Sequence, residues 1–219
     1  MKFSWHGHSC IYLEAMNGCR IIIDPFIIGN ELSDLDPESL DVDYIILTHG
    51  HADHVGDTLE IAKRTGATVI AVAELAEFME KRGAKAHGMN IGGRFEFDFG
   101  SVKFVHAQHS SSYDGFYMGE PAGIVVDDGY ATIYHAGDTA LYSDMSLIGS
   151  VDVAFLPIGD NYTMGIDDAL KAAQRVPSEL YVPIHYNTFP VIEQNPYEFV
   201  NRLDGENGLV PEIGDLIEI

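Results

Sequence analysis

The sequence predicts an α/β fold of two packed β-sheets with helices on their outer faces. Two observations lead to this prediction. Strand-like and helix-like segments alternate in two similar halves of the chain, and 46% of its 219 residues are hydrophobic, enough for a full core. No Pro/Gly/Ser-rich linker, low-complexity tract or short repeat separates the halves. We therefore expect one domain over residues 1–219.

In the first half, short strands precede two helix-strand units. The apolar and alternating runs predict strands at 2–6, 10–15, 20–24, 44–48 and 68–71, and helices at 55–64 and 73–82. Asn17-Gly18 predicts a two-residue hairpin turn between the second and third strands, because this dipeptide favours positive φ angles. In that register Asp24 pairs with Ile11, so Asp24 and His8 approach the same end of the sheet.

The second half repeats the pattern. Alternation is clearest where Phe95, Phe97 and Phe99 share one face of a strand. Strands are expected at 94–99, 102–108, 123–127, 130–135, 151–157, 179–184 and 216–219, and helices at 166–176 and 197–203. Two stretches, 25–41 and 110–122, are predicted to be irregular, and the second has the length of loops that carry function. It could form a pocket wall, a lid or a subunit contact.

Charge and hydropathy exclude several classes of protein. Asp and Glu number 34 against 12 Lys and Arg, a net charge of −22, and no basic stripe is visible, so generic nucleic-acid binding is not expected. No apolar run reaches the roughly 18 residues that span a bilayer, and the N-terminus lacks a signal-peptide pattern. Cys10 and Cys19 lie too far apart in the hairpin to bridge, which favours a reducing cytoplasm. We expect a small-molecule substrate and no membrane partner, and a homo-oligomer stays open.

The strongest chemical signal is the segment from His49 to His54, which reads His-Gly-His-Ala-Asp-His between an apolar strand and a helix. Residues two apart in an extended chain face the same way about 6.6 Å apart, so His49 and His51 can converge on one metal ion. Asp53 and His54, carried round the turn, would then point toward a second ion. Ordinary polar loop residues rarely match this spacing by chance.

Further candidate ligands stand at the ends of other predicted strands. His109 follows the strand at 102–108, Asp138 follows the strand at 130–135, and His185 follows the apolar run at 179–184. A single histidine at a strand end is more often just hydrogen-bonded. Together with the histidine-rich segment, however, these residues complete two three-ligand sites, and a carboxylate such as Asp138 can bridge two cations.

These motifs resemble those of the metallo-β-lactamase superfamily, and most closely its metal-dependent hydrolases related to ascorbate-6-phosphate lactonases. The resemblance covers nearly the whole chain. It is carried by the segments at 5–10, 23–26, 49–54, 109–111, 136–139, 156–164 and 183–190. It implies the four-layer αββα sandwich of two mixed sheets with helices on the outer faces that this superfamily shares.

The resemblance also implies how the ligands divide. One ion would be held by His49, His51 and His109, a second by Asp53, His54 and His185, with Asp138 shared between them. We therefore expect two divalent metal ions. Zinc or manganese fits such histidine and carboxylate ligands best, and iron or nickel also fits.

Other residues are assigned supporting roles. His8 could be an extra ligand, a substrate contact or the acid that protonates the leaving group, and we rank the acid first, so that His8 and Asp53 are the expected catalytic residues. Asp24 is expected to accept a hydrogen bond from a ligand histidine. A purely structural role for His8 and Asp24 stays open. The substrate pocket is expected to include Asp160, Asn161, Tyr186 and Asn187.

The expected function is a dinuclear metal-dependent hydrolase that uses a metal-bridging hydroxide on a small ester, lactone or phosphoester. Ser110-Ser111-Ser112 follows His109, whereas glyoxalase-like and lactamase-like relatives have Thr-Pro-Gly there, which argues against thioester and antibiotic hydrolysis. Two alternatives stay open: a phosphodiesterase or nuclease acting on nucleotides or short RNA, and a non-catalytic metal-binding module.

Overall fold

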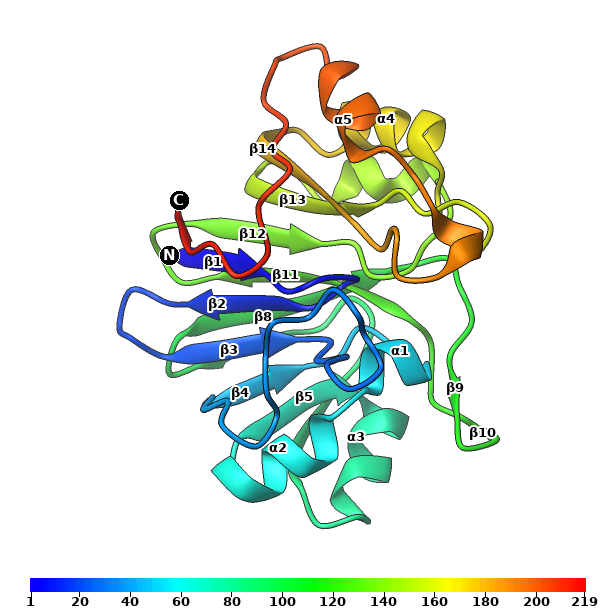
Figure 1. Cartoon of the computed structure of the whole chain (residues 1–219). Coiled ribbons are helices and arrows are strands. Elements are labelled where there is room, and N and C mark those ends of the chain that lie inside the picture. The colour runs from blue at the N-terminus through cyan, green and yellow to red at the C-terminus, as the bar shows by residue number, and fades with distance from the viewer.

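The computed structural model describes residues 1–219 and contains two mixed β-sheets that pack against each other (Figure 1). In spatial order the seven-stranded sheet contains β15 (Ile217–Glu218), β1 (Lys2–Trp5), β2 (Ile11–Glu14), β3 (Arg20–Ile23), β4 (Tyr44–Ile46), β5 (Thr68–Val72) and β6 (Lys85–Met89). The six-stranded sheet contains β14 (Ser178–Ile184), β13 (Val151–Pro157), β12 (Thr132–His135), β11 (Ala122–Asp127), β8 (Gly100–His106) and β7 (Arg94–Phe97). Each sheet combines parallel and antiparallel pairs, as expected from hairpins followed by helix-strand units.

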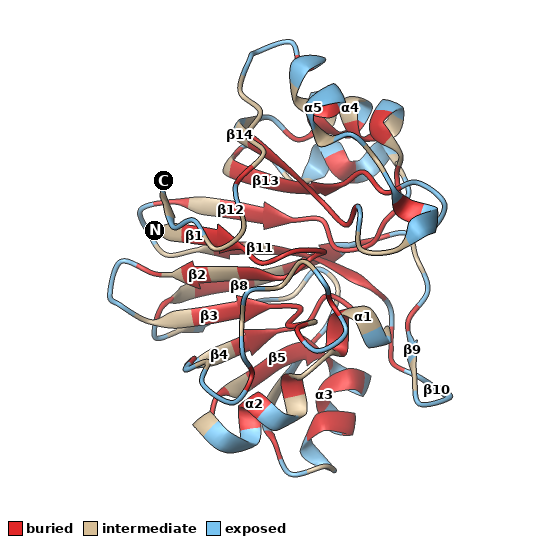
Figure 2. Cartoon of the chain, in the orientation of Figure 1, coloured by how far each residue is buried: buried red, intermediate tan, exposed pale blue.

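Helices cover the outer faces of both sheets. The α-helices are α1 (Ala52–Val55), α2 (Thr58–Thr65), α3 (Ala73–Glu80), α4 (Ile166–Arg175) and α5 (Pro196–Asn201), with 3-10 turns at Ser143–Leu147 and Pro190–Ile192. The α2 and α3 helices contact β5, and α4 and α5 contact β13 and β14, respectively. Figure 2 shows the buried inner strands and the exposed outer sides of the helices. This arrangement confirms the predicted αββα layers. None of the helices has the length and apolar character needed to cross a membrane.

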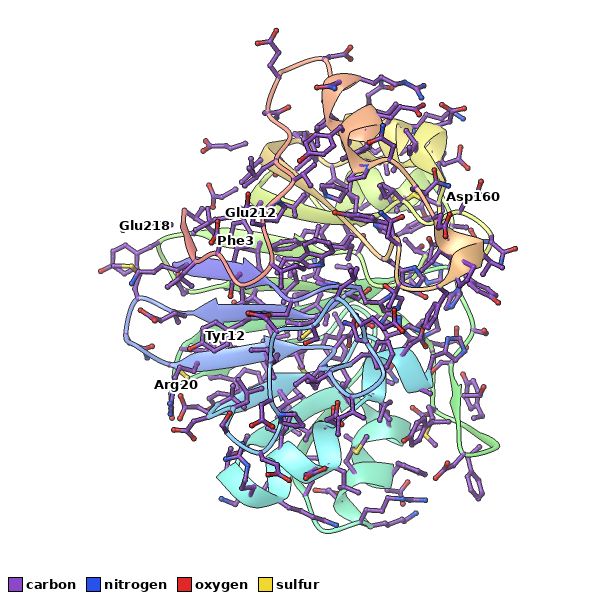
Figure 3. The ribbon with its side chains drawn as sticks, in the orientation of Figure 1. Phe3, Tyr12, Arg20, Asp160, Glu212 and Glu218 are labelled. Atoms are coloured by element: carbon purple, nitrogen blue, oxygen red, sulfur yellow. The ribbon has the colours of Figure 1, made fainter.

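Apolar side chains from both sheets and from the helices that cover them form one core cluster of 60 buried residues. In β2 burial alternates, so Ile11 and Leu13 face the core, whereas almost every residue of the parallel strand β13 is buried. Phe3 of β1, labelled in Figure 3, meets Phe155 of β13 edge to face, with ring centroids 5.1 Å apart. This rigid core holds the strand ends in place.

The hairpin register differs from the predicted one by one residue. Ile11 pairs with Ile23 rather than with Asp24, and the Ala15 amide bonds the Cys19 carbonyl across a three-residue turn. Gly18 has a φ of 83° and takes the left-handed position that such a turn requires. Asp24 therefore stands just beyond the strand pair.

The structure also contains elements that the sequence did not predict. β6 is an edge strand whose residues alternate poorly, because His87 and Gly88 interrupt its apolar pattern. A two-stranded ribbon of β9 (Ser112–Tyr113) and β10 (Phe116–Tyr117) occupies the stretch expected to be irregular. The predicted helix at 55–64 is two helices, α1 and α2, separated at Gly56 and Asp57.

Candidate metal centre

The predicted ligands come from five segments that meet at one edge of the sandwich, on the right in Figure 1. Each segment follows the end of a strand, so the core fixes where its side chains emerge. The segments that follow β1, β4, β8, β12 and β14 carry His8, the residues from His49 to His54, His109, Asp138 and His185, respectively.

One group of ligand atoms, which we name the outer cluster, consists of His49, His51, His109 and Asp138. Each residue offers one ligand atom, and these atoms all lie within 4.8 Å of one another. His49 Nε2 is 2.9 Å from His51 Nδ1, and His109 Nε2 is 3.5 Å from Asp138 Oδ2. Three nitrogens and a carboxylate oxygen at this spacing suit a transition-metal ion.

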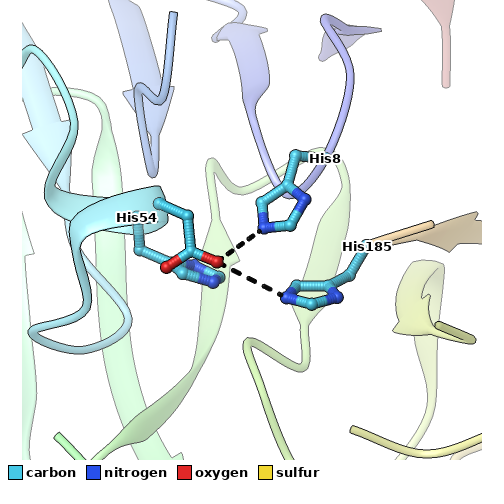
Figure 4. Close-up of side chains that lie close together, drawn as sticks. His8, His54 and His185 are labelled. Carbon is cyan, nitrogen blue, oxygen red and sulfur yellow. Dashed lines mark hydrogen bonds and ion pairs between the residues drawn. The ribbon is translucent and has the colours of Figure 1, made fainter. Parts of the chain in front are cut away.

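A second group, the inner cluster, consists of His8, Asp53, His54 and His185, whose ligand atoms also lie within 4.8 Å of one another. His8 Nε2 is 3.1 Å from Asp53 Oδ2, and the ring centroids of His8 and His185 are 4.0 Å apart. Figure 4 shows the rings of His8, His54 and His185 close together, and its dashed lines mark the ion pairs of His8 and His185 with the Asp53 carboxylate. His8 thus lies among the predicted ligands of the second ion.

Asp138 connects the two clusters. Besides facing the outer histidines, its carboxylate lies 3.2 Å from His54 Nε2 and 3.1 Å from His185 Nε2 of the inner cluster. One carboxylate thus faces histidines of both clusters, the position that the sequence assigned to a shared ligand.

The donor atoms fit metal ions better than they fit one another. His54 Nε2, His185 Nε2, His185 Nδ1 and Asp138 Oδ1 are buried and have no hydrogen-bond partner, although several lie close together. An unsatisfied buried polar group costs about 1–3 kcal/mol. Cations placed among these atoms would satisfy His54, His185 and Asp138 at once, so the residues present fit the metal ions that the motif implies.

Burial keeps most of these imidazoles ready to bind a metal. It lowers the pKa of His49 well below its ordinary value, and that of His8 to about 4, where the nearby His185 adds to the effect. Burial acts against ionisation of Asp138, but the histidines His185 and His54 outweigh it and hold its pKa well below the usual range. Neutral imidazoles and an ionised carboxylate are the forms that coordinate metals.

His54 is held differently, by an acceptor behind it. Asp24 Oδ2 lies 2.7 Å from His54 Nδ1, and the same carboxylate accepts bonds from the Thr48 amide and hydroxyl. Although burial alone would lower the pKa of His54, Asp138 and Asp24 raise it well above its ordinary value. The contact leaves His54 Nε2 free to face Asp138, as expected for Asp24 from the sequence.

Several of these residues have strained backbones. His8, Asp24 and His185 have φ angles of 52°, 46° and 56°, in the left-handed region that ordinary residues avoid. The His8 carbonyl accepts hydrogen bonds from the His185 amide at 3.0 Å and from Trp5 Nε1 at 2.9 Å, which ties two of the strained positions together. Such strain gathers at functional sites, where the surrounding structure supports it.

Small residues allow the turns of the site to pack closely. At Gly50 a Cβ atom would come within 2.5 Å of Met118, and at Gly137, which has a φ of 62°, within 3.0 Å of Thr48. Ser111 Oγ accepts a bond from the Gly50 amide, a contact that the sequence did not reveal. The polar loop after β8 thus supports the histidine-rich turn.

His8 is more deeply buried than we expect for the acid that protonates the leaving group. It is fully buried, its Nδ1 is 2.9 Å from the Thr188 hydroxyl and its Nε2 faces Asp53. It does not line the cavity described next. A group that protonates the leaving group needs access to it, so this position supports the extra-ligand or structural role that the sequence also left open.

A cavity of about 660 Å³ opens beside the clusters. Its volume suits a small organic molecule. Its lining combines polar side chains of both clusters with apolar side chains. The lining residues are Phe26, His51, Ala52, Asp53, His109, Ser110, Asp138, Tyr162, His185, Phe189 and Val191.

The predicted pocket residues need correction, because Asp160, Asn161, Tyr186 and Asn187 do not line this cavity. Asp160, labelled on the right of Figure 3, and Asn161 both have positive φ, and the Asp160 carbonyl accepts a hydrogen bond from the Thr163 amide in a tight turn. Tyr186 stacks on Trp5, and Asn187 Oδ1 accepts a bond from the Gln194 amide. Each of these polar groups supports a turn or the core.

The sequence motifs did not indicate the apolar side chains that line the cavity, which we name the apolar wall. It is formed by Phe26, Tyr162, Phe189 and Val191, three of which fall within the family-like segments. A search for aromatic residues close after strand ends, beside the polar ones, could have found Phe26 and Phe189.

Comparison with known proteins agrees with this geometry. The sequence model of a family described as the Beta-lactamase superfamily domain matches residues 19–186. A protein named UPF0173 metal-dependent hydrolase from Bacillus cereus is 55% identical, with 100% of each chain covered. Its namesake from Enterococcus faecalis is also 55% identical, over 96% of this chain and 97% of its own.

Solved structures give the same picture. Igni18, a metallo hydrolase from the archaeon Ignicoccus hospitalis, superposes with a TM-score of 0.91 at 37% identity, over 100% of this chain and 98% of its own. An isothiocyanate hydrolase from Delia radicum gut bacteria superposes with a TM-score of 0.79 at 20% identity, over 100% and 99%. The second likeness concerns the fold alone.

Proposed function

The chain belongs to the β-lactamase superfamily and is a metal-dependent hydrolase, and from this premise we propose that it cleaves a small ester or lactone with two divalent metal ions. The observation that carries the proposal is the pair of clusters, each with four ligand atoms within 4.8 Å, that face one cavity. The outer cluster would hold one ion and the inner cluster the other, with Asp138 contacting both.

The chemistry divides between the ions and the chain. When bound, two such ions supply Lewis acidity that lowers the pKa of water toward about 7 and polarises a carbonyl oxygen. The protein positions the reacting groups: histidines and carboxylates are held rigidly by the strand ends, and the cavity places the substrate beside them.

Asp53 is the proposed catalytic carboxylate, because it belongs to the inner cluster and also lines the cavity. Burial raises its pKa, but the contact with His8 and the charge of His54 outweigh burial and lower it below the ordinary value. Asp53 therefore stays ionised and can accept a hydrogen bond from the attacking water, which aims that water at the carbonyl.

His8 acts through Asp53 in this proposal. With Thr188 on one ring nitrogen and Asp53 on the other, it fixes the direction of the Asp53 carboxylate and completes the inner cluster. Zinc or manganese ions fit these ligands, and iron or nickel would also be accepted.

The alternatives fit less well. A nucleotide or RNA carries phosphates besides the scissile one, and the cavity lining contains no lysine or arginine that would receive them. A purely structural metal site is closed, whereas both clusters contribute residues to the cavity wall.

The test is reconstitution. Chelated protein is loaded with zinc or manganese and assayed with a panel of esters, lactones and bis-p-nitrophenyl phosphate, while metal content is measured by mass spectrometry. We expect two ions per chain and turnover of an ester or lactone that chelation removes and metal restores. Less than one ion per chain, with turnover unaffected by chelation, would contradict the proposal.

A further inference from the structure

Two chemically different sets of side chains line the cavity. One set consists of polar side chains from both clusters, among them Asp53 and Asp138, and the other consists of the four apolar side chains of the apolar wall. Since the clusters are the site of reaction in the proposed function, the apolar wall is where the rest of the substrate would lie. The wall is formed by Phe26, Tyr162, Phe189 and Val191.

Two aromatic side chains of the wall lie against a histidine of the inner cluster. The rings of Phe26 and Phe189 meet the buried His8 ring edge to face, with centroids 5.6 and 5.5 Å away, and lie 6.2 Å from each other. Tyr162 and Val191 are more than half exposed, large apolar side chains that the core does not use. One cavity thus has apolar side chains both beside a candidate metal ligand and at the protein surface, which suits an apolar substituent.

The cavity offers no positive side chain. None of the 12 lysines and arginines lines it. Arg82 and Arg202, for example, pair instead with acidic residues on the surface, Asp114 and Asp167. The net charge of −22 adds a long-range field that repels anions. A phosphate or carboxylate group on the substrate would thus find no partner beyond the reacting centre.

We propose that the substrate is uncharged outside its scissile group and carries an aryl or alkyl substituent that lies on the wall of Phe26, Tyr162, Phe189 and Val191. The inference rests on the proposed function and names its substrate class. It separates this chain from the phosphorylated lactones that the family resemblance implies, because those would place an anion against phenyl rings.

Turnover of two matched esters tests the inference. Ethyl butyrate and monoethyl succinate share the leaving group and acyl length, but the second ends in a carboxylate, and proton release during hydrolysis of either ester is followed by pH-stat titration. The metal-loaded protein should hydrolyse the butyrate with a kcat/KM at least about tenfold higher, since hydrophobic contact and charge both favour it. The preference should persist in 0.5 M NaCl, which screens the long-range field but not contacts inside the cavity.

A lysine substituted into the apolar wall tests whether the substituent of the substrate lies there. Val191→Lys should raise the succinate-to-butyrate ratio at least about tenfold, because it puts a cation where the carboxylate would lie. Leu147→Lys adds the same charge at an exposed position outside this cavity and should leave the ratio unchanged. Equal ratios in the two variants would overturn the assignment of the wall.

Ligand binding to the metal-free protein distinguishes a wrong substrate class from a wrong proposed function. The chelated protein should bind butyranilide, an amide analogue of the neutral ester, at least about tenfold more tightly than succinanilate in calorimetry, and Phe189→Ser should remove most of the difference. Preference for succinanilate, or for the succinate ester, would overturn the substrate class while the hydrolase stands. Butyranilide binding without hydrolysis of any ester or lactone would instead overturn the proposed function and leave the apolar site.

Discussion

The outer and inner clusters use similar residues but stand in different surroundings. His51 and His109 of the outer cluster are partly exposed, whereas His8, His54 and His185 of the inner cluster are buried. His49 of the outer cluster is also buried, with the Thr48 hydroxyl 2.9 Å from its Nδ1. The inner histidines also have contacts behind them, Asp24 for His54 and Thr188 for His8. The difference teaches that the fold buries all three histidines of the inner cluster but only one of the three histidines of the outer cluster.

The largest expected effect comes from Asp138, since it contacts both clusters. Asp138→Ala should reduce turnover by about 1,000-fold or more, beyond the 10–100-fold typical for a residue that supports a ligand, and should lower the metal content of both sites. Asp138→Asn keeps the size of the side chain and should show the same loss if charge is what matters. Asp160→Asn, a nearby acid outside the cavity, is the control and should keep normal activity and metal content.

The rate of metal release from each cluster tests the difference between the outer and inner clusters. A chelator should release the ions in two phases, the outer ion at least about tenfold faster, because buried and supported ligands lose metal more slowly. Stopped-flow measurement with a chromogenic chelator separates the phases. A single phase that accounts for both ions would show that the clusters do not differ in the proposed way.

Asp24 tests the support behind the inner cluster. Asp24→Asn should weaken metal binding at the inner site by about 10–100-fold and leave the outer site nearly unchanged. Asp34→Asn is the matched control, because Asp34 lies 2.6 Å from His6 Nδ1 in a similar pair outside the clusters. Metal titrations followed by calorimetry give both affinities. If the two variants behaved alike, Asp24 would have no special role.

Acid should destabilise the metal-free protein. The pKa of His8 is lowered from 6.5 to about 4 by burial, so below pH 6.5 the unfolded chain takes up a proton that the folded chain refuses. The stability attributable to His8 falls by about 3 kcal/mol between these values. His49 acts in the same direction, whereas His54, with a raised pKa, opposes it.

Thermal unfolding of the chelated protein between pH 7 and pH 4 measures this loss. His8→Gln should flatten the curve, and His106→Gln, an exposed histidine on β8, should not. A stability that rises on acidification would mean that the buried histidines are charged.

Most of the fold, and most of the residues of both clusters, could be predicted from the sequence. The spacing from His49 to His54 and the positions of His109, Asp138 and His185 after strands depend on local pattern, which a sequence displays. Tyr162 and Val191 could not be predicted in this way, because they come to line one cavity only after distant loops fold together. The role of His8 depends on burial, and the hairpin register on one glycine φ angle, neither of which the pattern reveals.

The central claim is that two ions occupy the two clusters, and anomalous X-ray diffraction from crystals of the manganese- or zinc-loaded protein tests it most directly. Two anomalous peaks are expected, one among His49, His51 and His109 and the other beside Asp53, His54 and His185, with Asp138 in contact with both. A single peak, or peaks at other places in the chain, would contradict the account.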